Sequence, residues 1–154
     1  SRFLTLTKGT GVINRIFHSY GDYTGDMEGR RNGALISMEN GKAVAFAIFN
    51  LQARGEMFVT HNDPVYEGMI VGLASKSGDL EINVMKGKKL TNMRTQGTDE
   101  NVVLTPVRQM SIAEQLSMLN TDEALEITPD SCRLRKAILD PHERKKSEKA
   151  IAAA

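Results

Sequence analysis

The side chains best suited to bind a ligand lie in residues 86–100 of this sequence. This segment carries four cations, which are Lys86, Lys88, Lys89 and Arg94. It also contains two glycines, Gly87 and Gly97, and shows neither helical nor strand periodicity. Cations at this density need water or a polyanion around them, and the phosphate backbone of a nucleic acid is the clearest polyanion. The alternative is a solvated surface loop that has no partner.

Other combinations of reactive side chains are sparse. His18, His61 and His142 are far apart and lack the cysteine or carboxylate spacing of a zinc site. Pairs of adjacent carboxylates, such as Asp122 and Glu123, do not bracket a substrate as an acid and a base must. The sequence also lacks the G-x-x-x-x-G-K-[ST] loop that holds nucleotide phosphates. We therefore predict no catalytic residue and no metal site.

Composition limits the class of protein. The 154 residues suit one compact domain, with room for the remnant of a second, and 40% apolar with 25% charged residues is ordinary for a globular protein. The net charge of +1 hides acidic residues gathered in 114–126 and basic residues gathered in 86–100 and after Arg133. The single cysteine, Cys132, favours the cytoplasm, and no apolar run is long enough to span a bilayer. A start without Met, inside an apolar pattern, indicates a fragment of a longer protein.

The first part of the chain predicts few elements. Residues 3–7 suggest the end of a helix or a short strand, and residues 11–17 suggest a strand after a glycine turn at 8–10. Residues 21–32 are polar and rich in glycine. We interpret 21–32 as a linker and place a domain boundary there.

The middle of the chain predicts a sheet and a buried helix. Residues 42–54 have apolar side chains at helical spacing, at Val44, Ala47, Ile48 and Leu51, and Gly55 follows as a stop. Strand-like segments at 34–38, 57–59, 69–73 and 80–84 are separated by turn formers at 62–64 and 77–79. We expect an α+β fold: a mainly antiparallel sheet or partial barrel, a buried helix at 42–54 and short flanking helices.

The last part predicts two helices around two extended segments. Ser111 and Glu114 have the spacing of a capping box for a helix that runs to about residue 120. Residues 124–127 and 132–135 are extended by their alternation. Pro141 opens a final helix that is basic and poor in large apolar residues, so we expect it to be solvated or held by a partner.

A series of short motifs runs through nearly the whole chain. In order, they are Thr7-Lys8-Gly9-Thr10-Gly11, Tyr20-Gly21, Arg31-Asn32-Gly33, Gly41-Lys42-Ala43, Phe49-Asn50-Leu51-Gln52, Arg54-Gly55, Val65-Tyr66-Glu67-Gly68-Met69, Lys86-Gly87-Lys88-Lys89-Leu90-Thr91-Asn92, Arg94, Gly97-Thr98-Asp99-Glu100, Leu104-Thr105-Pro106, Ile127-Thr128-Pro129 and Arg133-Leu134-Arg135-Lys136. This series resembles the carboxy-terminal part of the TypA/BipA translational GTPase family, and so many matches in one order are more specific than any single motif. The tail after Ala150 departs from the family pattern.

The resemblance implies a division into domains. Residues 1–20 would be the end of domain V, a ferredoxin-like module related to that of elongation factor G, and residues 33–150 would be the carboxy-terminal domain peculiar to the family. GTP and Mg²⁺ would belong to a GTPase domain absent from this chain, so the chain itself would need no cofactor and would not be an enzyme.

The resemblance also implies the partners. In the family, an extended loop of the last domain lies against RNA of the large ribosomal subunit and against the acceptor arm of A-site tRNA. The residues that would bind RNA here are Lys86, Lys88, Lys89, Leu90, Thr91, Asn92, Arg94, Gly97, Thr98, Arg133, Arg135 and Lys136. We expect a cytoplasmic monomer without membrane contact that acts in large-subunit assembly and in stress- or cold-adapted translation. The alternative is a module that docks ribosomal protein, or the parent's own GTPase domain, through the sheet or the acidic residues 114–126.

Overall fold

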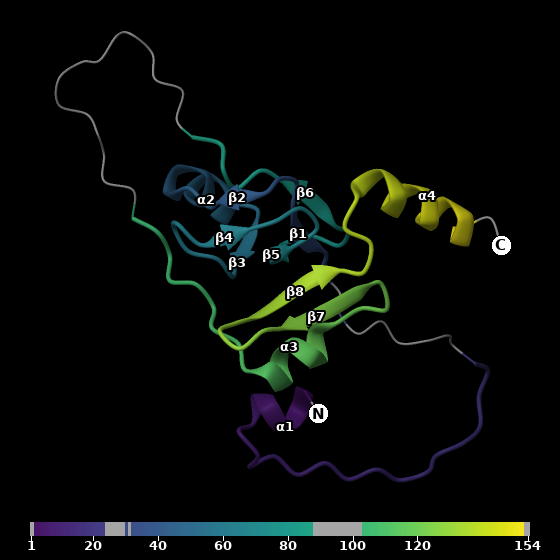
Figure 1. The fold of residues 1–154 in the computed structure, drawn as a ribbon. Helices are drawn as coiled ribbons and strands as arrows, with labels where there is room; N and C mark the ends of the chain where they lie inside the picture. The colour runs from purple at the N-terminus through teal and green to yellow at the C-terminus, as the bar shows by residue number, and fades with distance from the viewer. Residues whose placement is uncertain (1, 24–29, 31, 88–102, 153–154) are drawn as a thin grey trace, which may run out of the picture.

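A computed structural model describes residues 2–23, 30, 32–87 and 103–152 of the chain. The fold is α+β, as predicted, and its centre is a four-stranded sheet with two small two-stranded ribbons beside it (Figure 1). The sheet has the order β3-β5-β1-β6, with β1 at Ala34–Ser37, β3 at Gly55–Met57, β5 at Ile70–Ala74 and β6 at Leu80–Ile82. The ribbons pair β2 at Gly41–Lys42 with β4 at Pro64–Val65, and β7 at Glu123–Ile127 with β8 at Cys132–Lys136. The helices are α1 at Arg2–Leu6, α2 at Ala45–Gln52, α3 at Ile112–Met118 and α4 at Pro141–Ala152.

The central sheet is mainly antiparallel, with one parallel pair. Strand β5 runs antiparallel to both β3 and β1, whereas β6 runs parallel to β1. The turn at residues 77–79, which contains Gly78 at a φ of 93°, sends β6 back in the direction opposite to β5. Because β6 then pairs on the far side of β1, the two strands must be parallel. The described strands therefore form an open mixed sheet.

Both faces of the sheet are covered. On one face, Leu35 and Val71 pack in a buried cluster with Ile48 of α2. On the other face, Ile36 and Ile70 pack against Leu134 of the β7–β8 hairpin. Neighbouring residues of a strand point to opposite faces, so β1 and β5 supply both clusters. Figure 1 shows the resulting layers, with α2 on one side of the sheet and the hairpin on the other.

The buried helix is shorter than the predicted 42–54. Ala47 and Ile48 are buried, which confirms the predicted apolar face. The helix nevertheless begins at Ala45, because Gly41–Lys42 pairs with β4 and Val44 keeps an extended backbone with φ −108° and ψ 134°. Gly55 follows as the first residue of β3, so the strand predicted at 57–59 lies two residues earlier.

The prediction for residues 11–17 is wrong, since this segment forms no strand. Val12, Ile16 and Phe17 are 81%, 91% and 72% exposed, respectively. A strand requires a neighbour for its backbone groups, and none of the described residues pairs with this segment. The preceding residues form the short helix α1 and then the predicted turn, where Lys8 and Gly9 have φ values of 50° and 79°.

The local signals near the C-terminus are confirmed. The Glu114 N–H donates to Ser111 Oγ at 3.3 Å, and Glu114 Oε2 accepts from the Ser111 N–H at 2.9 Å, which completes the capping box of α3. The two predicted extended segments pair as the β7–β8 hairpin, and Pro141 is the first residue of α4. Of the helices in the described ranges, none has the length and apolar character needed to cross a membrane.

Candidate nucleic-acid interface

The chain enters the predicted binding loop from a fixed position. Val84 is fully buried, and its carbonyl accepts a hydrogen bond from the Val44 N–H at 2.9 Å. Met85 packs against the first core cluster, whereas Lys86 and Gly87 are exposed. The core thus holds the chain up to Met85 and releases it at the first predicted RNA-binding residue.

The chain returns from the loop at an equally fixed position. Leu104 packs against the same cluster. The Thr105 N–H donates to Gln52 Oε1 at 3.3 Å, and Gln52 Nε2 donates back to the Thr105 carbonyl at 3.1 Å. Val44 and Gln52 stand at the two ends of α2, whose eight residues rise about 12 Å at ~1.5 Å per residue. The two ends of the loop, at residues 84–85 and 104–105, are therefore held by opposite ends of α2.

Most of the predicted RNA-binding residues lie outside the described ranges. These are Lys88, Lys89, Leu90, Thr91, Asn92, Arg94, Gly97 and Thr98. The structure thus places the two anchored ends of the loop and the exposed Lys86, while the roles of the other residues stay predictions.

The outer face of the β7–β8 hairpin carries two further predicted residues, Arg133 and Arg135. Their guanidinium groups lie 3.6 and 3.9 Å from the Glu126 carboxylate, and about a third of each side chain is exposed. The Tyr66 hydroxyl donates to the same carboxylate at 2.7 Å. Burial and this hydrogen bond raise the pKa of Tyr66 to about 12, so the phenol stays protonated. Two arginines against one glutamate leave an accessible positive charge that suits a phosphate.

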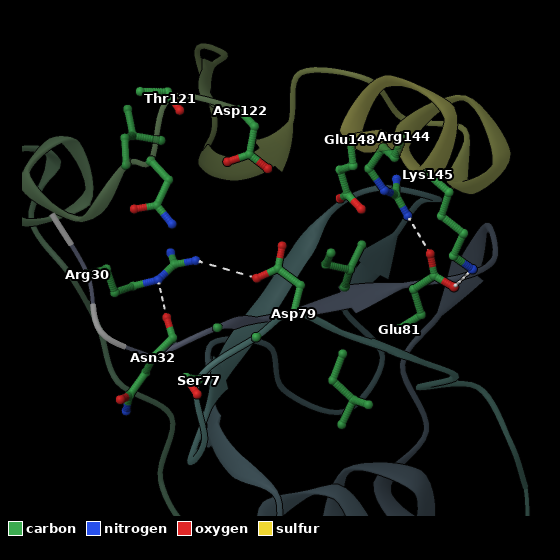
Figure 2. Close-up of a pocket in the computed structure, with 16 residues that line it drawn as sticks. Arg30, Asn32, Ser77, Asp79, Glu81, Thr121, Asp122, Arg144, Lys145 and Glu148 are labelled. Carbon is green, nitrogen blue, oxygen red and sulfur yellow. Dashed lines mark hydrogen bonds and ion pairs between the residues drawn. The ribbon is translucent and has the colours of Figure 1, made fainter. Parts of the chain in front are cut away.

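An open pocket of about 1000 Å³ lies between the 77–81 turn and strand, the 119–122 turn and helix α4 (Figure 2). Its charged side chains are largely paired with one another. Arg30 lies 4.0 Å from Asp79, and Arg144 lies 3.1 Å from Glu81. A pocket whose charges already neutralise each other offers little to a small charged ligand. No group of three or more His, Cys, Asp or Glu side chains that could hold a metal ion occurs in the described ranges.

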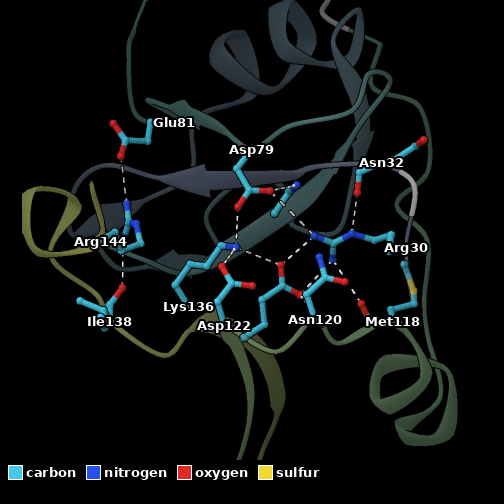
Figure 3. Close-up of polar contacts among 12 residues, drawn as sticks. Arg30, Asn32, Asp79, Glu81, Met118, Asn120, Asp122, Lys136, Ile138 and Arg144 are labelled. Atoms are coloured by element: carbon cyan, nitrogen blue, oxygen red, sulfur yellow. Dashed lines mark hydrogen bonds and ion pairs between the residues drawn. The ribbon is translucent and has the colours of Figure 1, made fainter. Parts of the chain in front are cut away.

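Arg30 was not predicted to have a role. Its guanidinium donates bidentate hydrogen bonds to the Glu123 carboxylate, at 3.1 and 2.7 Å, and also donates to the Met118 carbonyl at 3.3 Å (Figure 3). The Arg30 and Glu123 side chains are 6% and 0% exposed. These two residues are 93 positions apart, so no local pattern could have paired them. Arg30 ties the segment predicted as a linker to the hairpin.

Lys136 lies in the same buried cluster, and this position does not fit its predicted role in RNA binding. Its ammonium lies 2.5 Å from Asp79, 2.5 Å from Asp122 and 3.2 Å from Glu123, and its side chain is 2% exposed. Burial lowers the pKa of Lys136, but the hydrogen bonds to Asp122 and Asp79 outweigh burial and raise it. Lys136 is thus a cation already surrounded by carboxylates. The sequence could have indicated this burial, because side chains alternate between the two faces of β8 and Lys136 therefore shares the inward face of Leu134.

Comparison with known proteins identifies the family of this fold. The TypA/BipA C-terminal domain matches residues 32–141, and the chain therefore belongs to the TypA/BipA family. The match includes the central sheet, both anchored ends of the loop and the β7–β8 hairpin. Its start at residue 32 adjoins the end of the predicted linker.

The relatives carry one shared description. The chain is 49% identical over 150 residues to the large ribosomal subunit assembly factor BipA of Buchnera aphidicola subsp. Schizaphis graminum. It is 48% identical over 151 residues to the protein of that name from Escherichia coli K12, and 47% over 150 residues to that from Salmonella typhimurium. Each alignment covers 97% of this chain but 25% of the relative, so the chain spans about a quarter of their length.

Proposed function

We propose that this chain is the ribosome-binding module of a TypA/BipA GTPase and that residues 86–100 contact RNA of the large ribosomal subunit and the acceptor arm of A-site tRNA. The observation that carries the proposal is the anchoring of this segment at both ends of α2. Because both ends of this cationic loop are anchored to the core, the loop can contact one site on a large partner without disturbing the core. The relatives' description as large ribosomal subunit assembly factors supports the choice of partner.

The proposed chemistry divides between charge and hydrogen bonding. Lys86, Lys88, Lys89 and Arg94 neutralise phosphates, which supplies affinity without reading sequence. Thr91, Asn92 and Thr98 hydrogen-bond to sugars or base edges, which irregular RNA exposes. Leu90 and Gly97 belong to the same stretch of backbone. Arg133 and Arg135 extend the contact onto the hairpin.

The wider role follows from the family. The module acts in large-subunit assembly and in stress- or cold-adapted translation, as a monomer in the cytoplasm. GTP hydrolysis, with its Mg²⁺, belongs to a different domain of the full-length protein. This chain contributes binding and no catalytic group.

Docking of a protein through the acidic residues 114–126 is the competing proposal, and the structure disfavours it. Glu114 is held by its own helix cap, Glu123 by Arg30 and Lys136, and Glu126 by Tyr66 and two arginines. Carboxylates already paired inside the fold would have to exchange these partners for a protein. Both faces of the sheet are covered as well.

Replacement of the four loop cations with alanine tests the proposal. The variant K86A/K88A/K89A/R94A should sediment less with purified large ribosomal subunits, and its binding should depend less steeply on salt. Each phosphate that the variant no longer neutralises should reduce the slope of log K against log salt by about 0.7–0.9. A matched variant, K86R/K88R/K89R, keeps the charges and should keep the slope.

Stability provides the second readout of this experiment. Surface substitutions change the free energy of unfolding by no more than ~0.5 kcal/mol, so the alanine variant should unfold at nearly the same urea concentration as the parent chain. Unchanged affinity together with an unchanged salt slope would remove the loop from the interface and favour protein docking. Cross-linking from Lys88 on bound ribosomes would then identify which RNA or protein lies nearest.

A further inference from the structure

Helix α4 presents one basic face. Successive residues of an α-helix are about 100° apart around its axis. With Lys145 at zero, Lys149 lies at about 40°, His142 at about 60° and Lys146 at about 100°. These four side chains therefore share one narrow arc of the helix, which we call the α4 stripe. Glu143 and Glu148 fall outside this arc.

The opposite side of α4 is the side that docks on the fold. Arg144 is buried, and its guanidinium donates to the Ile138 carbonyl at 3.2 Å, to the Leu139 carbonyl and to Glu81 at 3.1 Å. Asp140 Oδ1 accepts from the N–H groups of His142 and Glu143, at 2.7 and 2.9 Å, and caps the first turn. Since the Arg144 anchor sets the rotation of the helix, the α4 stripe faces solvent.

The charges of the α4 stripe are almost unpaired. Lys145 lies 3.4 Å from Glu81 yet is 62% exposed, and within the described part of the chain Lys146 and Lys149 make no ion pair. The arc holds no large apolar side chain that could enter the groove of a protein partner. Three lysines and a histidine on one face complement a polyanion.

Helix α4 is held to β6, the strand that precedes the predicted loop in the chain. Arg144 and Lys145 both contact Glu81, the middle residue of β6, and β6 is the edge strand that leads to Lys86. Lys86 lies five positions after Glu81, a reach of at most about 18 Å. Figure 1 shows α4 beside β6, whereas the chain leaves toward the loop on the side of α2 and β2.

We infer that the exposed face of α4, formed by His142, Lys145, Lys146 and Lys149, is a second contact with the RNA phosphate backbone, on the same domain as the loop contact. This inference rests on the proposed function, because it takes ribosomal RNA as the partner. Two contacts on one domain would bind the RNA at two points and fix the orientation of the module on it.

The variant K145Q/K146Q/K149Q tests the inference in the chain described here, with purified large ribosomal subunits as the probe. Glutamine has a helix propensity close to that of lysine, so the helix should persist, as circular dichroism would report. The salt slope should fall by about 0.7–0.9 for each lysine that contacts a phosphate. The charge-preserving variant K145R/K146R/K149R should retain the slope and the affinity. Arg144 stays untouched in both variants.

Comparison with the loop variant K86A/K88A/K89A/R94A separates the outcomes. An unchanged slope in the α4 variant, with a reduced slope in the loop variant, overturns this inference and leaves the proposed function standing. The reverse pattern supports the α4 contact and removes the loop. Weaker binding at an unchanged slope overturns RNA as the occupant and indicates a protein surface. If the unaltered chain does not bind the subunits at all, both proposals fall.

Discussion

Arg135 and Lys136 are neighbours on β8, yet their side chains lie in opposite environments. The Arg135 side chain is 33% exposed beside Glu126, whereas the Lys136 side chain is 2% exposed among three carboxylates. The sequence predicts RNA binding for both residues, because both belong to the basic run Arg133-Leu134-Arg135-Lys136. A basic residue can serve a phosphate only if its charge reaches solvent, and the strand's alternation assigns the two residues to different faces.

The inner and outer groups also differ in what they contribute. In the inner group, Arg30 and Lys136 neutralise the buried Glu123 carboxylate and also pair with Asp79, which joins Arg30, the 77–79 turn and the hairpin. Removing one partner of such a group lowers stability, because a buried charge loses part of its compensation. In the outer group, Lys86, Arg133 and Arg135 are screened by water, and their loss costs the fold little. Basic residues inside this domain serve the fold, and those outside are available to a partner.

Among the basic residues of β8, Lys136→Ala should cause the largest loss of stability. It leaves Glu123 buried without one of its cations, and we expect a loss of about 3–5 kcal/mol in the free energy of unfolding. Arg135→Ala is the matched control, with an expected loss of ~0–1 kcal/mol. Urea denaturation of both variants checks the prediction. Equal losses would mean that the two faces of β8 do not differ as described.

Ile48→Ala provides an apolar reference for the loss expected at a buried position. The Ile48 side chain is fully buried, with 0% of its surface exposed, and its truncation should cost ~2–5 kcal/mol. Phe49, the next residue, is 49% exposed, so Phe49→Ala should cost less than half as much. Chemical denaturation measures both. If Ile48→Ala cost less than about 1 kcal/mol, α2 would not be part of the core.

The pH dependence of stability offers the smallest and most specific test. Burial raises the pKa of Asp79, but the hydrogen bond from the Ala34 N–H and the contact with Lys136 outweigh burial and lower it. A carboxyl whose pKa is lower in the folded state stabilises the fold above its unfolded pKa of about 4. This stabilisation is lost as the pH falls through the folded pKa.

Asp79→Asn should therefore flatten the acid limb of a stability–pH curve measured by urea denaturation from about pH 7 to pH 3. Some acid sensitivity should remain. Backbone N–H groups at two helix starts lower the pKa values of Glu114 and Asp140 as well. Lys136 has a raised pKa, so its contribution is complete below about pH 10 and is lost as the pH rises through its folded pKa. An acid limb identical to that of the parent chain would contradict the role of Asp79.

Local rules predicted many of the elements correctly. The capping box at Ser111, the start of α4 at Pro141, the apolar face around Ile48 and the extended segments of the hairpin all depend on residues within a few positions of one another. The ordered motifs also identified the TypA/BipA family, which the match over residues 32–141 confirms. The prediction of a strand at 11–17 was wrong because this apolar segment has no partner strand among the described residues.

The sequence by itself thus determined the helix caps, most of the strands, the family and the cationic composition of residues 86–100. Only the tertiary structure decided that Arg30 pairs with Glu123, that the buried Lys136 pairs with Asp79, and that β6 lies parallel to β1. It also decided that Arg144 anchors α4 and turns three lysines outward. Caps and amphipathic patterns act between residues close in the chain, whereas ion pairs and sheet order join segments far apart in it. Which cations remain free for a partner therefore depends on where the fold places the carboxylates.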